Sequence, residues 1–226
     1  MKLRYFSHSA FLVTTSGGKK ILIDPFLDGN PTSPVKSGDV QADYIVITHG
    51  HGDHIGDSFK IAKRSNSLII CVNELAIYCQ SKGYQAHNMH IGGAHNFDFG
   101  RVKFTIAHHG SISPDGIYCG EPSGVLLTID GKTIYHTGDT GLFYDMKLIG
   151  EQGIDVAILP IGDNYTMGPD DALRAVKLIQ PQRVIPDHFN TWPIIAQDVN
   201  AWAARVRAET STEPVVLAPG QSCRLS

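Results

Sequence analysis

Residues 44–54 read YIVITHGHGDH, an apolar run followed by three histidines and one aspartate within six residues. Imidazole and carboxylate groups are the usual protein ligands of zinc and similar divalent metals. A polar loop with surface histidines is the ordinary alternative. However, glycines alternate with the candidate ligands and let the backbone fold tightly between them. The segment therefore indicates a metal site at the end of a strand.

The spacing of the four candidate ligands suggests two metal positions. His49 and His51 are two residues apart, so in an extended segment both side chains point to one face. Asp53 and His54 follow where the chain turns, and they can point to a second position nearby. Each position would need further ligands from distant parts of the chain.

Four more segments end a short apolar run with polar residues. They are 106–111 (IAHHGS), 134–140 (IYHTGDT), 184–189 (VIPDHF) and, less clearly, 21–25 (ILIDP). In layered α/β folds, ligands collect at strand ends because the scaffold is rigid there and the loops can vary. These segments are therefore candidates for the remaining ligands.

The order of these residues resembles the metallo-β-lactamase superfamily, in which an H-x-H-x-D-H run is followed by His, Asp and His, here His109, Asp139 and His188. Further segments resemble the smaller UPF0173 family of metal-dependent hydrolases, close to an ascorbate-phosphate lactonase branch. They cover nearly the whole chain and include 23–26 (IDPF), 73–76 (NELA), 136–140 (HTGDT) and 159–169 (LPIGDNYTMGP).

The resemblance implies an α/β fold, the four-layer αββα metallo-β-lactamase sandwich, formed by residues 1–226 as one domain. It also implies two divalent metal ions at one edge of the sandwich. Zinc is the expected metal, with manganese or iron as alternatives. By position in the motif, the first metal takes His49, His51 and His109, the second takes Asp53, His54 and His188, and Asp139 bridges the two.

One local ambiguity concerns the adjacent residues His108 and His109. Strand alternation lets only one of them face the metals, and the family pattern, with the ligand directly before Gly-Ser, selects His109. His108 and Asp187 stand where the family more often has apolar or aromatic residues. We expect His108 to be partly exposed or to support the ligands, and Asp187 to have no role.

The activity that the resemblance implies is hydrolysis. Two metals about 3.5–4 Å apart can hold a bridging water and lower its pKa. The resulting bridging hydroxide would attack a small-molecule ester, lactone, amide or phosphoester. Asp139 would fix the metal separation, and Asp53 would ligate the second metal and orient the hydroxide. Zinc-dependent lactamases often have Cys where Asp139 stands, which disfavours lactam cleavage.

Several other polar residues near expected strand ends are candidates for substrate contact or for holding the ligands in place. Each of them could equally be a cap or an ordinary hydrogen-bond partner. A metal-bound imidazole usually has a carboxylate or carbonyl on its other nitrogen, and Asp24 or Asp163 could supply one. The full set is His8, Asp24, His136, Asp163, Asn164, Asn190 and Thr191.

Two other functions stay open. A redox enzyme on the same fold would commonly carry Glu at the position of His51 and fuse a flavin domain, or would use a single iron and fewer ligands. Here His51 and all seven ligands are present. The other is a non-catalytic metal-binding protein, which would show no hydrolysis in a broad screen of esters, lactones and phosphodiesters.

Composition narrows the class of protein. The 226 residues are 42% hydrophobic and 18% charged, which suits one globular domain. The 19 basic and 22 acidic residues give a net charge of −3 without a basic stripe, so nucleic-acid binding is not expected. No signal peptide or membrane-spanning run is evident, and the four cysteines show no paired spacing. We expect a cytoplasmic enzyme acting on a small molecule, without nucleic-acid or membrane partners; a homo-oligomer is left open.

Periodicity and turn residues predict the elements. Asp130-Gly131 predicts a hairpin turn, and Asn73 is the expected N-cap of a helix. The two halves of the chain share a rhythm of β segments followed by strand–helix units. The predicted strands are 3–15, 20–23, 44–48, 68–72, 126–129, 133–135, 154–160, 184–186 and 215–217, and the predicted helices are 57–64, 73–81, 142–149, 169–179 and 195–209.

Overall fold

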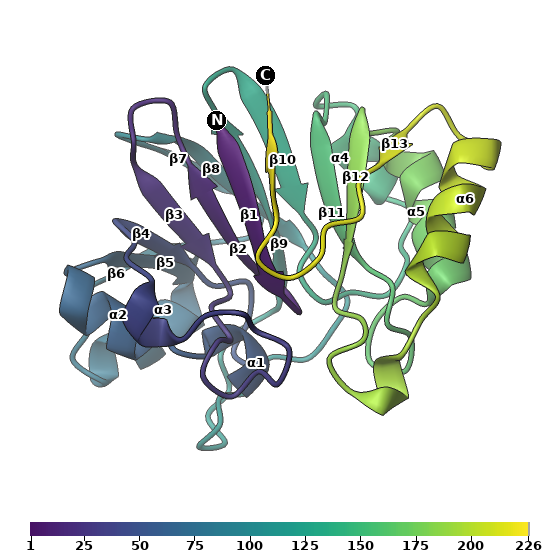
Figure 1. The fold of residues 1–226 in the computed structure, drawn as a ribbon. Helices are drawn as coiled ribbons and strands as arrows, with labels where there is room; N and C mark the ends of the chain where they lie inside the picture. The colour runs from purple at the N-terminus through teal and green to yellow at the C-terminus, as the bar shows by residue number, and fades with distance from the viewer. Residues whose placement is uncertain (226) are drawn as a thin grey trace.

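Two seven-stranded β-sheets pack face to face, with helices on both outer faces (Figure 1). The structure is a computed structural model that describes residues 1–225. Figure 1 shows helices α1, α2 and α3 beside one sheet and α4, α5 and α6 beside the other. The expected four-layer αββα sandwich is thereby confirmed.

The first sheet has the strand order β14-β1-β2-β3-β4-β5-β6. From β14 to β3 neighbouring strands are antiparallel, and from β3 to β6 they are parallel. The strands are β1 (Lys2–Ser7), β2 (Ala10–Thr14), β3 (Lys20–Ile23), β4 (Tyr44–Val46), β5 (Leu68–Val72), β6 (Ala86–Met89) and β14 (Ser222–Arg224).

The second sheet repeats this pattern in the order β7-β8-β9-β10-β11-β12-β13. Three antiparallel pairings, from β7 to β10, are again followed by three parallel ones, from β10 to β13. The sequence predicted a shared pattern in the two halves of the chain. In the structure, this pattern is the same order of antiparallel and parallel strand pairs in each sheet. The strands are β7 (Ala94–Phe97), β8 (Gly100–Ile106), β9 (Ser123–Ile129), β10 (Lys132–His136), β11 (Val156–Pro160), β12 (Arg183–Asp187) and β13 (Glu213–Pro214).

The helices are short, and the apolar side chains that they bury belong to the clusters beneath the outer layers. In α5, for example, Pro169 occupies the first turn and Ala172, Val176 and Ile179 are buried at helical spacing. No helix in residues 1–225 is long and apolar enough to cross a membrane. The helices are α1 (Gly52–Ile55), α2 (Ser58–Ser65), α3 (Asn73–Ser81), α4 (Met146–Gly150), α5 (Pro169–Ile179) and α6 (Val199–Glu209), with 3-10 turns η1 (Ser37–Asp39) and η2 (Pro193–Ile195).

Three buried apolar clusters hold these layers together. The cluster between the sheets includes Phe11 and Phe104, both fully buried. A second cluster joins the first sheet to α2 and α3, and a third joins the other sheet to α4, α5 and α6 around Trp202. Burial of one large apolar side chain contributes about 1.5–3 kcal/mol, so the sandwich supplies a rigid frame for the loops at its edges.

The N-terminal run 3–15, predicted as one strand, is a hairpin of β1 and β2. Ser7 and His8 adopt φ angles of 103° and 58°, a left-handed conformation that turns the chain. Such angles are uncommon in residues other than glycine and concentrate at functional sites. The turn places His8 at the tip of the hairpin, at the edge of the sandwich.

Other element boundaries also differ from the prediction. Val72, not Asn73, is the N-cap of α3. The last helix begins at Val199 instead of Ile195 because the Asp198 carboxylate caps it, accepting hydrogen bonds from the backbone N–H groups of Asn200 and Ala201. The short helix α1 and strand β14 were not predicted, and in place of the strand expected at 215–217 the chain forms the two-residue β13 just before it. The strands 20–23 and 68–72 and the helix 169–179 have the predicted bounds, and α3 ends at Ser81 as predicted.

The pairing directions explain where the candidate ligands meet. Strands β1 and β3 both run antiparallel to β2, and β4 is parallel to β3, so all three end at one edge. By the same reasoning, β8, β10 and β12 end together in the other sheet. All seven candidate ligands lie in the segments after β4, β8, β10 and β12, and Figure 1 shows α1 at that edge.

Candidate metal centre

His49, His51 and His109 form a first group of possible ligands. Their ligand atoms all lie within 4.8 Å of one another, and His49 Nε2 is 3.0 Å from His51 Nδ1. Burial, reinforced by the neighbouring His54, lowers the pKa of His49 well below its usual value. Burial also lowers the pKa values of His51 and His109. The three rings are therefore neutral at pH 7 and have lone pairs available for a metal.

Asp53, His54 and His188 form a second group, and His8 joins them within the same 4.8 Å limit. Burial would raise the pKa of Asp53, but a hydrogen bond from His8 and the charge of His54 hold it well below its usual value. This carboxylate is ionised at pH 7. One acidic oxygen and two imidazoles are a ligand set suited to a divalent metal.

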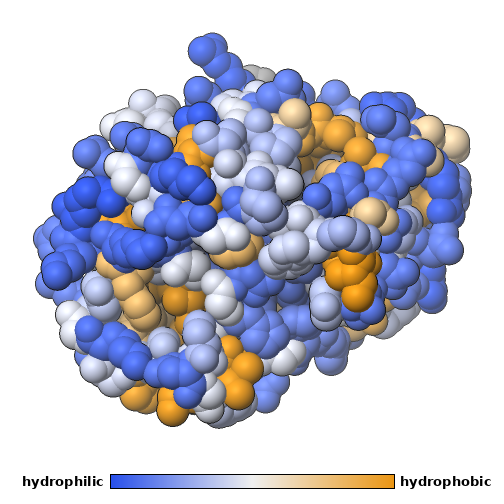
Figure 2. Space-filling model, turned by 60° about the horizontal axis from the view of Figure 1, so that its bottom comes forward, coloured by the Kyte–Doolittle hydropathy of each residue, from blue (hydrophilic) through white to orange (hydrophobic). Residues whose placement is uncertain are grey.

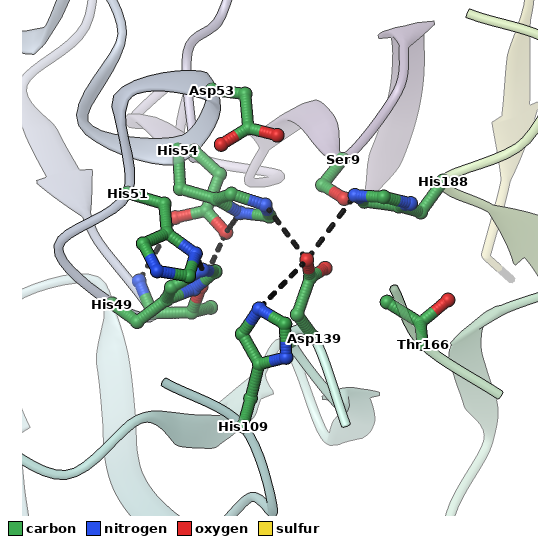
Figure 3. A network of polar contacts seen from close by, with 12 residues as sticks. Ser9, His49, His51, Asp53, His54, His109, Asp139, Thr166 and His188 are labelled. Carbon is green, nitrogen blue, oxygen red and sulfur yellow. Dashed lines mark hydrogen bonds and ion pairs between the residues drawn. The ribbon is translucent and has the colours of Figure 1, made fainter. Parts of the chain in front are cut away.

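Asp139 lies between the two groups (Figure 3). Its Oδ2 atom is 3.3 Å from His54 Nε2, 3.1 Å from His188 Nε2 and 3.6 Å from His109 Nε2. Burial would raise the pKa of Asp139, but His188 and His54 hold it well below its usual value. The carboxylate is thus ionised and contacts rings from both groups.

Several atoms at this point are buried without a partner. His54 Nε2, His188 Nε2 and Asp139 Oδ1 make no hydrogen bond with any residue of the range 1–225. The two imidazole nitrogens lie near the Asp139 carboxylate without hydrogen-bond geometry. Buried polar groups are nearly always satisfied, so each exception calls for an explanation. A divalent metal ion fits this set of nitrogen and oxygen donors.

Asp24, fully buried after β3, holds two of the candidate ligands. Its Oδ1 accepts a hydrogen bond from the backbone N–H of Thr48 (2.9 Å), and its Oδ2 accepts from Thr48 Oγ1 (2.6 Å) and His54 Nδ1 (2.8 Å). Thr48 Oγ1 in turn lies 3.0 Å from His49 Nδ1. These contacts keep protons on the Nδ1 atoms and direct both Nε2 atoms toward the centre, as metal-binding histidines require.

His8, at the tip of the β1–β2 hairpin, is held by three contacts. Its Nδ1 is 2.8 Å from Thr191 Oγ1, its Nε2 is 3.2 Å from Asp53 Oδ2, and its carbonyl accepts a hydrogen bond from the backbone N–H of His188. Burial and the neighbouring His188 lower the pKa of His8 to about 4. The neutral ring therefore links Asp53 to Thr191.

His136, the last residue of β10, is fully buried. Its Nδ1 accepts a hydrogen bond from the backbone N–H of Gly138, so its Nε2 carries the proton and donates to the Ser9 carbonyl. Asp187, expected to have no role, is in fact buried 3.5 Å from His136 Nε2. Burial raises the pKa of Asp187 well above its usual value. By contrast, His108 is exposed and packs against the Phe143 ring.

Three predicted residues do not support the ligands. Asp163, Asn164 and Asn190 are exposed, and none of them is hydrogen-bonded to a candidate ligand. The suggestion that Asp163 holds a metal-binding imidazole is therefore wrong; Asp24 does so. All three have left-handed φ angles, between 51° and 62°, and lie in tight turns.

Two glycines are required by close approach. A Cβ on Gly50 would lie 2.6 Å from the Cβ of Cys119, and one on Gly138 would lie 2.6 Å from the Ser123 carbonyl oxygen. Gly138 also has a φ of 61°, which disfavours other residues. These contacts fix the backbone beside His51 and Asp139 against the rest of the sandwich.

A cavity of about 440 Å³ opens onto the centre, a size usual for small-molecule sites. Five of the seven candidate ligands line it, together with Tyr165, Trp192 and Ile194, which the sequence did not single out. Figure 2 brings this edge forward and shows hydrophilic surface with separate hydrophobic patches beside it. Tyr165 and Trp192 lie in loops that also carry predicted site residues. A large aromatic side chain next to predicted site residues was therefore the feature of the sequence that could have identified them.

Comparison with known proteins agrees with this geometry. Residues 19–189 match the family model described as "Beta-lactamase superfamily domain". The chain therefore belongs to the beta-lactamase superfamily. The chain is 52% identical to a "UPF0173 metal-dependent hydrolase" of Pelotomaculum thermopropionicum over the full length of both. It is 53% identical to one of Bacillus licheniformis, covering 90% of this chain and 91% of the relative. Within the superfamily, it is thus a member of the UPF0173 family.

A solved structure supports the same placement. Igni18, described as a novel metallo hydrolase from the archaeon Ignicoccus hospitalis, superposes with a TM-score of 0.91. The two proteins are 38% identical, and the alignment covers 100% of this chain and 99% of Igni18. The agreement extends over both sheets and the edge that carries the candidate ligands.

Proposed function

We propose that this protein is a hydrolase with a dinuclear metal centre. In this proposal, His49, His51 and His109 hold one divalent ion, Asp53, His54 and His188 hold the other, and Asp139 bridges them. The position of Asp139 carries the proposal, because its Oδ2 lies within 3.6 Å of imidazole nitrogens from three separate segments. Zinc is the first metal to test, followed by manganese and iron.

Metal ions held there would lower the pKa of a bound water and polarise the bond under attack. The protein's own groups would orient the reaction. Asp53, held by His8 through Oδ2, would ligate the second ion and orient the attacking water with a remaining lone pair. The water oxygen bonds to the carbonyl carbon or phosphorus, the bond to the leaving group breaks, and the leaving group takes up a proton. An ester would give an acid and an alcohol, and a lactone would give a single hydroxy acid.

The test combines metal content with turnover. Zinc-loaded protein should contain two ions per chain and hydrolyse at least one member of a panel of esters, lactones, amides and phosphoesters. His51→Ala and Asp139→Ala should lose metal and turnover while the circular dichroism spectrum is unchanged. His108→Ala is the matched control, because His108 is exposed and lies outside both groups. It should retain both properties.

Three results would contradict the proposal. Turnover that survives in metal-free variants would show that the metal centre is not the catalyst. One iron per chain with oxygen uptake would favour a redox enzyme on the same fold. Two bound metals without turnover across the whole panel would favour a non-catalytic metal-binding protein.

A further inference from the structure

The cavity over the metal centre has walls of a distinct chemistry. Beyond the candidate ligands, its lining consists of Tyr165, Trp192 and Ile194. Tyr165 and Ile194 are 52% and 58% exposed, which is high for side chains of their size, and both border the cavity. Surface of this kind is stabilised when an apolar group covers it.

Contacts with neighbouring residues hold the cavity wall at Trp192 and Ile194 in a fixed position. Trp192 packs edge-on against His8 at a centroid distance of 5.0 Å and lies 6.1 Å from the Phe26 ring. The loop that carries Trp192 and Ile194 is closed at its base, where Asn190 exchanges two hydrogen bonds with the backbone of Gln197. The apolar wall is therefore in position before a ligand arrives.

Tyr165 is positioned by a second tight turn. Asp163 and Asn164 have φ angles of 62° and 51°, and the backbone N–H of Tyr165 bonds the Asp163 carbonyl. Two residues on, the N–H of Met167 bonds the carbonyl of Thr140, next to Asp139. Tyr165 is thereby tied to the loop that carries the bridging carboxylate.

The cavity lacks the groups that recognise anions. No lysine or arginine within residues 1–225 lines it. Binding of phosphate or carboxylate groups usually relies on such side chains, often through bidentate contacts of arginine. The two acidic residues that line the cavity, Asp53 and Asp139, are both candidate metal ligands, so they offer no partner to an anion. A phosphate or carboxylate on the part of a substrate away from the metals would therefore have no lysine or arginine partner on the cavity wall that residues 1–225 form.

We propose that the substrates are uncharged away from the bond that is cleaved and carry an aromatic or branched aliphatic group, which packs on Trp192, Tyr165 and Ile194. This inference rests on the proposed hydrolase function and narrows it to neutral carboxylic esters, lactones or amides. Substrates with a phosphate or carboxylate away from that bond are disfavoured because the cavity wall within residues 1–225 offers no cationic side chain to pair with it. The apolar wall, not the metal centre, sets this preference.

Trp192 offers a direct measurement of binding. The chain contains two tryptophans, and the other, Trp202, is 1% exposed in the helical layer. Quenching of tryptophan fluorescence by a ligand in the cavity should therefore come from Trp192. We expect benzamide to quench the zinc-loaded protein with saturation and to bind about 10-fold or more tightly than 4-carboxybenzamide, as expected when an anion lacks its partner. Trp192→Phe should remove the signal and retain the neutral preference in turnover.

A charge placed in the wall tests the inference by turnover. Phenyl acetate and 4-acetoxybenzoate differ only in a carboxylate away from the ester. Ile194→Arg should raise the kcat/KM ratio of the anionic to the neutral ester by about 10-fold or more, because it supplies the missing cation. Ile77→Arg is the matched control, since Ile77 is 57% exposed on α3 and does not line the cavity. It should leave the ratio unchanged.

The outcomes separate this inference from the hydrolase proposal. The inference is overturned if 4-carboxybenzamide binds as tightly as benzamide, if neither quenches Trp192, or if both arginine variants change the ratio equally. Absence of turnover with a neutral binding preference would instead refute the hydrolase function and support the apolar character of the site.

Discussion

Replacement of Asp24 by asparagine tests how the centre is held, because it removes one charge without changing shape. Asp24 has a φ of 43°, which asparagine also tolerates, so the backbone need not move. The carboxylate accepts from three buried donors, one at Oδ1 and two at Oδ2. An amide can accept on one side only, so the other side of the new side chain would present an N–H to another donor.

Both orientations of the amide are unfavourable. If the NH₂ group faces His54, the ring must accept at Nδ1 and carry its proton on Nε2, the atom that faces Asp139. If it faces the backbone of Thr48, a buried N–H is left without a partner. An unsatisfied buried group costs about 1–3 kcal/mol, and loss of a partner of a metal-binding imidazole typically weakens metal binding by about 10–100-fold.

The assay is a zinc titration against a chromophoric chelator, with urea unfolding of the metal-free protein in parallel. Asp24→Asn should bind its weaker zinc ion about 10–100-fold less tightly. Asp57→Asn is the control, because Asp57 is also buried and accepts from the backbone N–H groups of Leu27 and Asp28 without touching the centre. Asp57→Asn should lower the free energy of unfolding and leave the zinc affinity unchanged. Unchanged zinc affinity in Asp24→Asn would refute the hydrogen-bond argument.

Two further predictions concern protons and packing. Burial would lower the pKa of His54, but Asp139 raises it well above its usual value, so the metal-free ring is protonated at pH 7. Zinc binding should therefore release protons, seen as a buffer-dependent heat in calorimetry, and Asp139→Asn should reduce the release; a heat independent of the buffer would contradict this. Gly50→Ala would place a Cβ 2.6 Å from that of Cys119 and should cost about 1–3 kcal/mol in urea unfolding. Gly38→Ala, where no atom lies within 4 Å, should cost less, and equal losses would argue against the close contact.

The sequence predicted the candidate ligands best, because they are clustered in the chain or directly follow a strand. The run at 49–54 and the strand ends before His109, Asp139 and His188 indicated which residues meet, because pairing directions bring strand ends to one edge. The strands 20–23 and 68–72 and the helix 169–179 were also predictable from hydrophobic periodicity and turn residues. Roles as metal ligands remain predictions, although the structure brings all seven side chains together.

The errors have a common physical cause. Residues 3–15 alternate like one strand, and the turn depends on left-handed backbone angles at Ser7 and His8 that ordinary propensities do not indicate. The contact between Asp187 and His136 and the cavity wall around Trp192 are likewise tertiary features. They arise from segments far apart in the sequence, and no local pattern specifies them.

The matching sheets have a consequence for stability. His49, His51, Asp53 and His54 follow a strand of the first sheet, whereas His109, Asp139 and His188 follow strands of the second. Each proposed ion would thus take ligands from both sheets. A metal ion at 1,000 times its dissociation constant adds about 4 kcal/mol to the free energy of unfolding. Here that stabilisation would oppose separation of the two sheets. The ions would thus stabilise the contact between the two sheets in addition to their role in hydrolysis. When a chelator removes them, the edge of the sandwich that carries the candidate ligands should unfold first.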